Sequence, residues 1–191
     1  MEKINIKNVI ISKQFENTEN LEEFYTIIQN KKINAKIVQA GDRINIEKDM
    51  YFDVLWPVDI KMISENAINN NSIVCKMIYK DFSMLFTGDI EKSAEEEIVN
   101  KYKNTNSLNS TVLKVAHHGS KSSSIQDFLN LVNPKFALIG VGEKNRYGHP
   151  NEEVLQRLIK IGAKIYRTDE DGEITIIVNK KGGINVTKII E

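Results

Sequence analysis

The sequence predicts an α/β protein in which amphipathic helices cover the outer face of a mixed β-sheet. Short apolar runs alternate with segments whose apolar residues recur every three or four positions, the patterns of strands and helices. In the second half, strands and helices alternate one by one, which is typical of such sheets. The chain contains no internal repeat and no linker rich in Pro, Gly or Ser. We therefore expect a single domain over residues 1–191.

The first half is expected to contain more strand than helix. An i, i+3, i+4, i+7 spacing after Thr18 predicts one helix, with an apolar stripe made of Leu21, Phe24, Tyr25 and Ile28. The polar stretch 65–71 is expected to be a loop. Two apolar runs separated by Lys80-Asp81 predict a hairpin of residues 72–79 and 82–86. Further short strands are expected at residues 8–11, 35–38, 44–46 and 51–56.

Helices and strands alternate in the second half. An apolar residue recurs every four positions from Ile90 to Tyr102, which predicts a helix. The next helix is expected to begin with a capping box formed by Ser124 and Asp127. Asn151 is expected to cap a third helix. Strands are expected at residues 112–116, 136–139, 164–166, 174–178 and 184–189.

Composition excludes several classes of protein. Hydrophobic residues make up 41% and charged residues 27% of the chain, which is typical of a globular protein. The 26 basic and 26 acidic residues balance, which excludes nucleic-acid binding through bulk charge but not through a local basic groove. The single cysteine, Cys75, excludes a disulfide framework. Without a signal peptide or an apolar run of roughly 18 residues, we expect a soluble chain, and its location stays open.

The first candidate site residue is Asp89, in the motif Thr87-Gly88-Asp89. It lies where an apolar strand ends and a helix begins, a place where open α/β sheets expose functional side chains. The simpler interpretation is that Asp89 only caps the following helix. This short motif alone favours the cap.

The second candidate is the motif His117-His118-Gly119-Ser120, directly after an expected strand. Adjacent side chains point to opposite sides of an extended chain, so we expect one of the two histidines to face the site. The alternative is a pair of loop histidines bonded to backbone. The serines of residues 120–124 favour a site, because such a turn at a helix N-terminus suits an anion. Ser120 and Ser122 are therefore candidate substrate contacts.

The third candidate is His149, in the motif Arg146-Tyr147-Gly148-His149-Pro150. A histidine at this position can act as a general acid, a hydrogen-bond donor to phosphate or a metal ligand. Arg146 and Tyr147 suit contacts with phosphate. The alternative is a structural histidine that holds the turn before Pro150.

All three candidates fall at the same kind of place, a strand end that leads to a helix. If the strands run in the same direction, these ends share one edge of the sheet. Aspartate and histidine together suit zinc or manganese, which many enzymes use for hydrolysis. This co-location favours a site over the three simpler interpretations.

The motifs TGD, AHHGS and YGHP, in this order, resemble the C-terminal hydrolase domain of the ComEC family of DNA-uptake channel proteins. The resemblance is dense over residues 72–174 and looser over residues 4–56. It implies a metallo-β-lactamase-like fold, an αββα sandwich with two divalent metal ions, zinc or manganese, between its sheets. In the family this domain is attached to a membrane channel, lies outside the cytoplasmic membrane, and is thought to degrade the DNA strand that is not imported.

The resemblance also implies roles for the candidate residues. Asp89 would bridge the two metal ions, and one of His117 and His118 would be a terminal ligand. Analogy with related nucleases favours His118. His149 would lie near the scissile phosphate of single-stranded DNA. The reaction would be attack of metal-activated water on a phosphodiester.

One part of the family pattern is absent from this sequence. The signature His-x-His-x-Asp-His does not occur, and none of the three histidines precedes His117. We therefore expect an αββα sandwich truncated at its N-terminus, with an incomplete metal site and partial or no metal occupancy. A missing N-terminal half or a second copy of the chain would then complete the unpaired sheet edge.

Three functions follow as hypotheses. The first is a metal-dependent phosphodiesterase or nuclease related to competence DNA uptake. The second is a catalytically inactive half-domain that acts only as a scaffold or partner surface. A phosphate-binding module without metal is the least favoured, because the sequence contains no glycine-rich phosphate loop.

Overall fold

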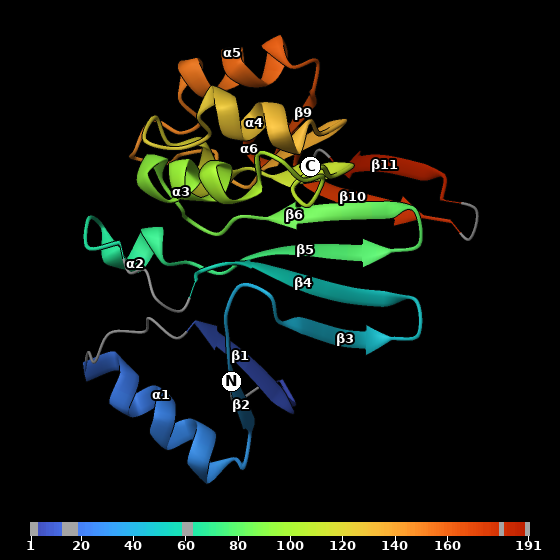
Figure 1. The fold of residues 1–191 in the computed structure, drawn as a ribbon. Helices are drawn as coiled ribbons and strands as arrows, with labels where there is room; N and C mark the ends of the chain where they lie inside the picture. The colour runs from blue at the N-terminus through green and yellow to red at the C-terminus, as the bar shows by residue number, and fades with distance from the viewer. Residues whose placement is uncertain (1–3, 13–18, 59–62, 180–181, 190–191) are drawn as a thin grey trace.

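The computed structural model describes residues 4–12, 19–58, 63–179 and 182–189 (Figure 1). In chain order its elements are β1 (Asn8–Ser12), α1 (Glu19–Asn30), β2 (Asn34–Val38), β3 (Arg43–Glu47), β4 (Met50–Trp56), α2 (Ala67–Asn70), β5 (Val74–Tyr79), β6 (Phe82–Phe86), α3 (Lys92–Tyr102), β7 (Val112–Lys114), α4 (Gln126–Val132), β8 (Phe136–Ile139), α5 (Glu152–Lys160), β9 (Lys164–Arg167), α6 (Thr168–Asp171), β10 (Glu173–Val178) and β11 (Ile184–Ile189). A short 3-10 helix, Ala116–Gly119, follows β7. Thr18, expected to precede the first helix, lies outside the described residues.

Seven strands form one mixed sheet in the order β3-β4-β5-β6-β7-β8-β9. Strands β3 to β6 pair antiparallel, whereas β6 to β9 pair parallel. Parallel neighbours need crossover connections, and α3, α4 and α5 lie in these connections. The carboxyl ends of β6, β7 and β8 therefore lie at one edge of the sheet. The predicted α/β class, a mixed sheet with helices on its outer face, is confirmed.

Three helices cover one face of the parallel half of the sheet. Leu85, Leu113 and Ala137 pair in register on adjacent strands, so their side chains point to the same face. All three are buried, and the same apolar cluster includes residues from each helix, among them Ile98, Leu129 and Leu158. Figure 1 shows α3, α4 and α5 gathered on one side of β6. Burial of each leucine or isoleucine side chain contributes about 1.5–3 kcal/mol, so this layer anchors the fold.

Two smaller sheets flank the large one. β1 and β2 pair parallel, with α1 between them in the chain, and β10 and β11 form an antiparallel hairpin. Figure 1 shows α1, β1 and β2 together, at the end of the molecule away from α5. The hydroxyl of Ser12 donates to the carbonyl of Asn71 (3.1 Å), which fastens β1 to the segment after α2. Among the described residues, no helix has both the length and the apolar character to cross a membrane.

The polar stretch 65–71 differs from the expected loop, because it contains the one-turn helix α2. Asn70 and Asn71 are buried there, and their side-chain amides donate to backbone carbonyls, including those of Glu65 and Ala67. The indole N–H of Trp56 donates to the carbonyl of Asn70 (2.7 Å). These hydrogen bonds satisfy the polar groups of a segment that is buried, although its sequence alone predicts exposure to solvent.

The expected capping box at the start of α4 is wrong. The N-cap residue of α4 is Ile125 rather than Ser124, and its apolar side chain makes no cap hydrogen bond. Instead, the carboxylate of Glu95 on α3 accepts hydrogen bonds from the backbone N–H groups of Ser124 (2.6 Å) and Ile125 (2.7 Å). Burial raises the pKa of Glu95 to about 7, although these hydrogen bonds oppose the shift. A tertiary contact thus replaces the local cap.

A close approach of backbone joins the loop after β7 to the loop after β8. Gly119 has a φ of +80°, and a Cβ atom placed there would lie 2.7 Å from the Cβ of Pro150. The N–H of Asn151 also donates to the carbonyl of Gly119 (2.8 Å). Glycine fits because it adopts positive φ without strain and leaves room for the proline ring.

Replacing Glu95 by glutamine is expected to remove part of the pH dependence of stability. The pKa of Glu95 is about 7 in the folded protein against an ordinary value of 4.5, so the folded state binds its proton more tightly than the unfolded state. Its contribution is fully present below pH 4.5 and is lost as the pH rises through about 7. The free energy of unfolding of the wild type, minus that of Glu95→Gln, should fall over this interval in urea titrations. The exposed neighbour variant Glu96→Gln should give a flat difference, and a flat difference for Glu95→Gln would contradict the prediction.

Replacing Gly119 by alanine is expected to lower the free energy of unfolding by about 1–3 kcal/mol, because positive φ and the contact with Pro150 both strain the new side chain. Gly142→Ala is the matched control, since a Cβ at Gly142 meets nothing within 4 Å. Urea denaturation of both variants tests this prediction. Equal free energies of unfolding for the two variants would contradict the prediction, because they would show that the two loops can move apart at Gly119 without loss of stability.

Candidate functional site

The loops that follow β6, β7 and β8 meet at the carboxyl edge of the sheet. The N–H of His117 donates to the carbonyl of Gly88 (3.1 Å), which joins the first loop to the second. The bond from Asn151 to Gly119 joins the second loop to the third. As expected, the candidate residues come together, and we refer to four of them as the rim cluster: Asp89, His117, His118 and His149.

The two adjacent histidines both belong to the rim cluster, which corrects the expectation that only one would. The strand β7 ends at Lys114, two residues before the expected boundary. His117 and His118 then adopt φ values of +46° and +55°, so the backbone is not extended at either residue. The alternation of side chains along a strand therefore does not apply here. The imidazoles of His117 and His118 can face different members of the same site.

His118 directs one ring nitrogen toward Asp89. Its Nδ1 lies 2.5 Å from the carbonyl oxygen of Gly140, and because a carbonyl only accepts, Nδ1 carries the proton. The other nitrogen, Nε2, lies 4.0 Å from Oδ1 of Asp89. Asp89 is half-exposed and does not cap α3, whose N-cap is Glu91. The aspartate thus keeps its carboxylate available at the edge of the sheet.

Glu91 lies beside His117. The buried Nδ1 of His117 lies 3.2 Å from Oε1 of Glu91, a distance that fits an ion pair when the imidazole is protonated, but this nitrogen makes no hydrogen bond with the described residues. Asn66 donates to the other carboxylate oxygen of Glu91 (2.7 Å). Burial raises the pKa of Glu91, but hydrogen bonds from Asn66 and its neighbours and the charge of His117 outweigh burial and lower it overall. The carboxylate is therefore anionic beside the histidine.

His149 completes the rim cluster. Its ring contacts that of His117 edge to face, with the centroids 5.8 Å apart. Asn145 clamps its backbone, accepting from the N–H of His149 (2.9 Å) and donating to its carbonyl (2.7 Å). Burial, and then the charges of His117 and His118, lower the pKa of His149. In its neutral form His149 has one nitrogen that can accept a hydrogen bond and one that can donate.

The predicted substrate contacts lie around this cluster but differ in access. Arg146 and Tyr147 are exposed in the loop before His149. Ser122 is exposed, whereas Ser120 is buried and its hydroxyl lies 3.0 Å from that of Ser122. The backbone N–H groups of Ser124 and Ile125, just before α4, already bond Glu95, so these two groups are not available to an anion in the serine-rich turn.

Two charged residues of the site were not among the sequence candidates. Glu91 stands two positions after Asp89, at the N-cap of α3, and an acidic residue at the start of a helix beside the Thr87-Gly88-Asp89 motif is the signal that could have found it. Lys114 interrupts the apolar run of β7. Burial lowers the pKa of Lys114, and the carboxylate of Asp89 opposes that shift. The lysine thus places a positive charge close to the rim cluster.

The rim cluster does not have enough converging donors for the metal centre that the family resemblance implies. Nε2 of His118 and the carboxylate of Asp89 face one another, but within the described ranges no three His, Cys, Asp or Glu side chains are arranged to hold one ion. A catalytic zinc ion needs about three protein ligands, and a two-metal site needs more. The described residues therefore do not fit a two-metal centre by themselves.

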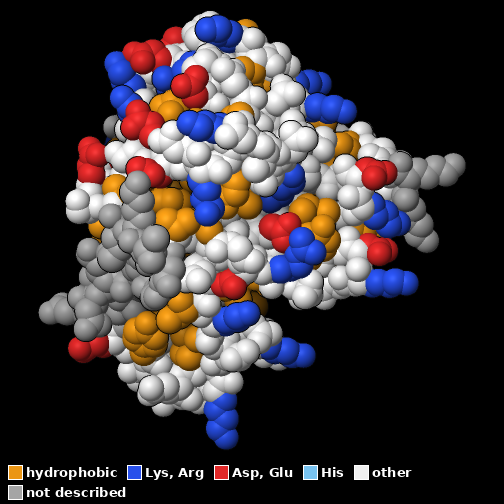
Figure 2. All heavy atoms as spheres, viewed as in Figure 1, with side chains coloured by type: hydrophobic (Ala, Val, Ile, Leu, Met, Phe, Trp, Pro, Cys, Tyr) orange, Lys and Arg blue, Asp and Glu red, His pale blue; other side chains and the backbone are white. Residues whose placement is uncertain are grey.

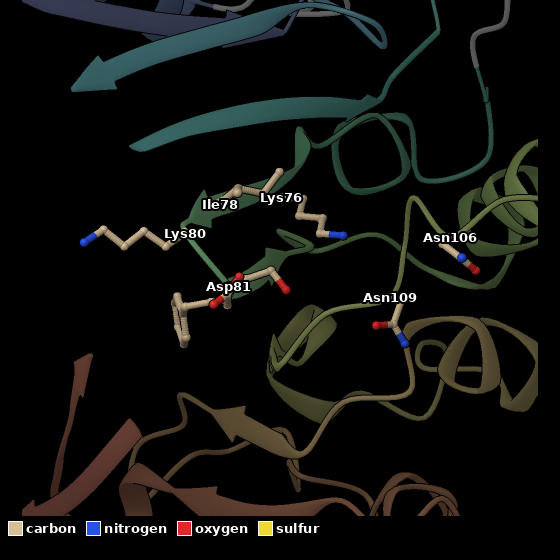
Figure 3. Close-up of a pocket in the computed structure, with 8 residues that line it drawn as sticks. Lys76, Ile78, Lys80, Asp81, Asn106 and Asn109 are labelled. Carbon is tan, nitrogen blue, oxygen red and sulfur yellow. The ribbon is translucent and has the colours of Figure 1, made fainter. Parts of the chain in front are cut away.

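A hollow lies at the end of β6 away from the rim cluster. It has a volume of about 500 Å³ and is lined by residues of the β5–β6 hairpin and of the loop after α3. Figure 3 shows that the side chains of Lys76 and Lys80 extend in different directions. The ammonium group of Lys76 donates to the carbonyl of Ser107 (3.2 Å). Since the two positive charges do not converge, we assign no anion site there.

Charge on the visible surface is mixed. Figure 2 shows Lys and Arg side chains spread over the described part of one face and interleaved with Asp and Glu, without a continuous basic tract. This distribution agrees with the net charge of zero. Any polyanion on this face would be bound without strong electrostatic attraction.

Comparison with known proteins identifies relatives of the chain. No protein-family model matches it. It is 36% identical over 169 residues to ComE operon protein 3 of Bacillus subtilis, a match that covers 88% of this chain and 21% of that protein. It is 36% identical over 138 residues to competence protein ComA of Neisseria gonorrhoeae, which covers 72% of this chain and 19% of that protein. A crystal structure from Parabacteroides distasonis, described as a metal-dependent hydrolase, is similar over 84% of this chain and 76% of that one, with a TM-score of 0.48 and 9% identity.

The chain spans about a fifth of the length of the two competence relatives. The similarity nevertheless extends over most of the chain itself, which carries the TGD, AHHGS and YGHP motifs on a mixed α/β fold. The chain therefore belongs to the ComEC family of competence proteins.

Proposed function

We propose that the rim cluster is part of a site that hydrolyses phosphodiester bonds in single-stranded DNA. The observation that carries the proposal is the convergence of Asp89, His118 and His149 from three separate loops. Two of these residues are also held in place: the carbonyl of Gly140 bonds the imidazole of His118, and Asn145 bonds the backbone of His149. Loops that serve only as connections do not need such support.

The side chains around the cluster suit a phosphodiester. Arg146 is exposed beside His149 and can form paired hydrogen bonds with phosphate oxygens. The exposed hydroxyl of Ser122 and the imidazole of His149 add neutral donors. We propose that these residues position the phosphate and that His149 exchanges a proton with a reacting oxygen. The names of the competence relatives support DNA as the substrate.

We further propose zinc or manganese as the cofactor, as in the family. These ions would supply an activated water molecule and neutralise the developing charge. Asp89 and His118 are the donors that this chain can offer. The remaining donors would come from a second copy of the chain or from another polypeptide segment.

One observation favours a second function, a non-catalytic scaffold. Asp89 and His118 are the only facing pair of donors among the described residues of the rim cluster, and a pair binds a divalent ion weakly. A chain with this donor set can retain the fold and the phosphate contacts without hydrolysing anything. Cleavage and binding therefore have to be measured separately.

Cleavage of labelled single-stranded DNA with added zinc or manganese tests the hydrolase. We expect His118→Ala and Asp89→Asn each to reduce cleavage by about 10- to 100-fold or more, because both remove a group at the reacting centre. Glu96→Gln, exposed on α3, is the control and should retain full activity. Cleavage that survives His118→Ala would indicate a contaminating nuclease. Binding of DNA without cleavage would favour the scaffold.

Metal content of the purified chain is expected to be well below two ions per chain, because only two donors face one another at the rim cluster. Elemental analysis after purification with zinc and manganese available measures it. A parallel sizing experiment shows whether metal retention accompanies dimerisation. Two tightly held ions on a monomer would contradict the donor count and indicate ligands beyond the rim cluster.

A further inference from the structure

A small cavity adjoins the rim cluster on the side of the β8 loop. Its volume is about 310 Å³, at the lower end of the range for small-molecule sites, and its wall includes His118, Val141, Gly142, Asn145, Tyr147 and His149. The wall is made mainly of ring faces, an aliphatic side chain and glycine backbone. It therefore suits an apolar, flat group better than a charged one.

Tyr147 is the unusual feature of this cavity. Its side chain is 83% exposed, the highest exposure among the large hydrophobic side chains of the described residues. Its ring lies nearly parallel to that of His149, with an interplanar angle of 19° and centroids 5.9 Å apart. An aromatic ring held in water beside a second ring offers a flat face for stacking.

The loop that carries Tyr147 is held in place before any ligand binds. Besides clamping His149, the amide of Asn145 donates to the carbonyl of Gly142 (3.3 Å). The N–H of Val141 donates to the hydroxyl of Thr168 (2.7 Å). A wall fixed in this way loses little conformational entropy when a ligand enters.

We propose that this cavity binds a nucleobase of single-stranded DNA, stacked on Tyr147. The choice of a nucleobase rests on the proposed function, because His118 lines the cavity and also faces Asp89. A base held here therefore places its adjoining phosphate at the rim cluster. The exposed Arg146, next to Tyr147 in the chain, is available to the same backbone.

The charge of the chain also points to stacking. With zero net charge, the chain as a whole gains little affinity from phosphate charge alone. Stacking of bases on aromatic side chains tolerates any sequence and depends weakly on salt. In the proposed site stacking would supply most of the affinity, whereas other single-strand-binding proteins combine stacking with a basic groove.

The test compares two labelled oligonucleotides of equal length, one of thymidine and one of abasic sugar-phosphate units. Binding to the 191-residue chain is measured by fluorescence anisotropy, with chelator present so that cleavage does not interfere. The wild type should bind the thymidine oligonucleotide roughly 5- to 150-fold more tightly. Tyr147→Ala should abolish this preference, and Tyr147→Phe, which keeps the ring, should retain it. Tyr25→Ala, a partly exposed tyrosine on α1, is the matched control and should also retain it.

The outcomes separate the two proposals. A preference that survives Tyr147→Ala, or a wild type that binds both oligonucleotides equally or neither, overturns the stacking site whatever the cleavage assay shows. A preference that depends on Tyr147 in a chain that cleaves no DNA supports the stacking site and counts against the hydrolase. Cleavage without any preference for bases supports the hydrolase and overturns the stacking site.

Discussion

Parallel pairing of β6, β7 and β8 is the constraint on which the rest of the site depends. Because parallel strands share a direction, the loops after them must leave the sheet at the same edge. Asp89, the adjacent histidines and His149 are therefore neighbours in space although they are far apart in the chain. The contact of Gly119 with Pro150 then closes the remaining distance between the second and third loops.

Helix α3 contributes a second constraint through two carboxylates at its start. Glu91 and Glu95 are four residues apart, and both reach toward the segment between β7 and α4. One carboxylate lies 3.2 Å from the imidazole of His117, and the other bonds the N–H groups of Ser124 and Ile125. Together with the bond from the N–H of His117 to Gly88, these contacts restrain the loop in which two successive residues have positive φ.

Sequence reasoning could predict the elements and the edge at which the site lies, because both follow from local periodicity and strand order. It failed where a distant group changes a local rule. The cap of α4 comes from Glu95 on another helix, so Ser124 and Asp127 could not reveal it. Strand β7 ends before the two histidines, so the alternation of side chains along a strand does not apply to them. Asn70 and Asn71 look like loop residues, but their amides are bonded and buried.

The support around the rim cluster bears on whether this chain catalyses or only binds. A non-catalytic scaffold needs the imidazoles to pack, but it does not need the proton of an imidazole to be fixed on one ring nitrogen. Here Nδ1 of His118 is bound to the carbonyl of Gly140, so Nε2 of the neutral ring, which faces Asp89, is left with a lone pair. A lone pair that faces a carboxylate is suited to a proton or a metal ion, and this supports the chemical role proposed above. The described donors are nevertheless too few to hold two metal ions.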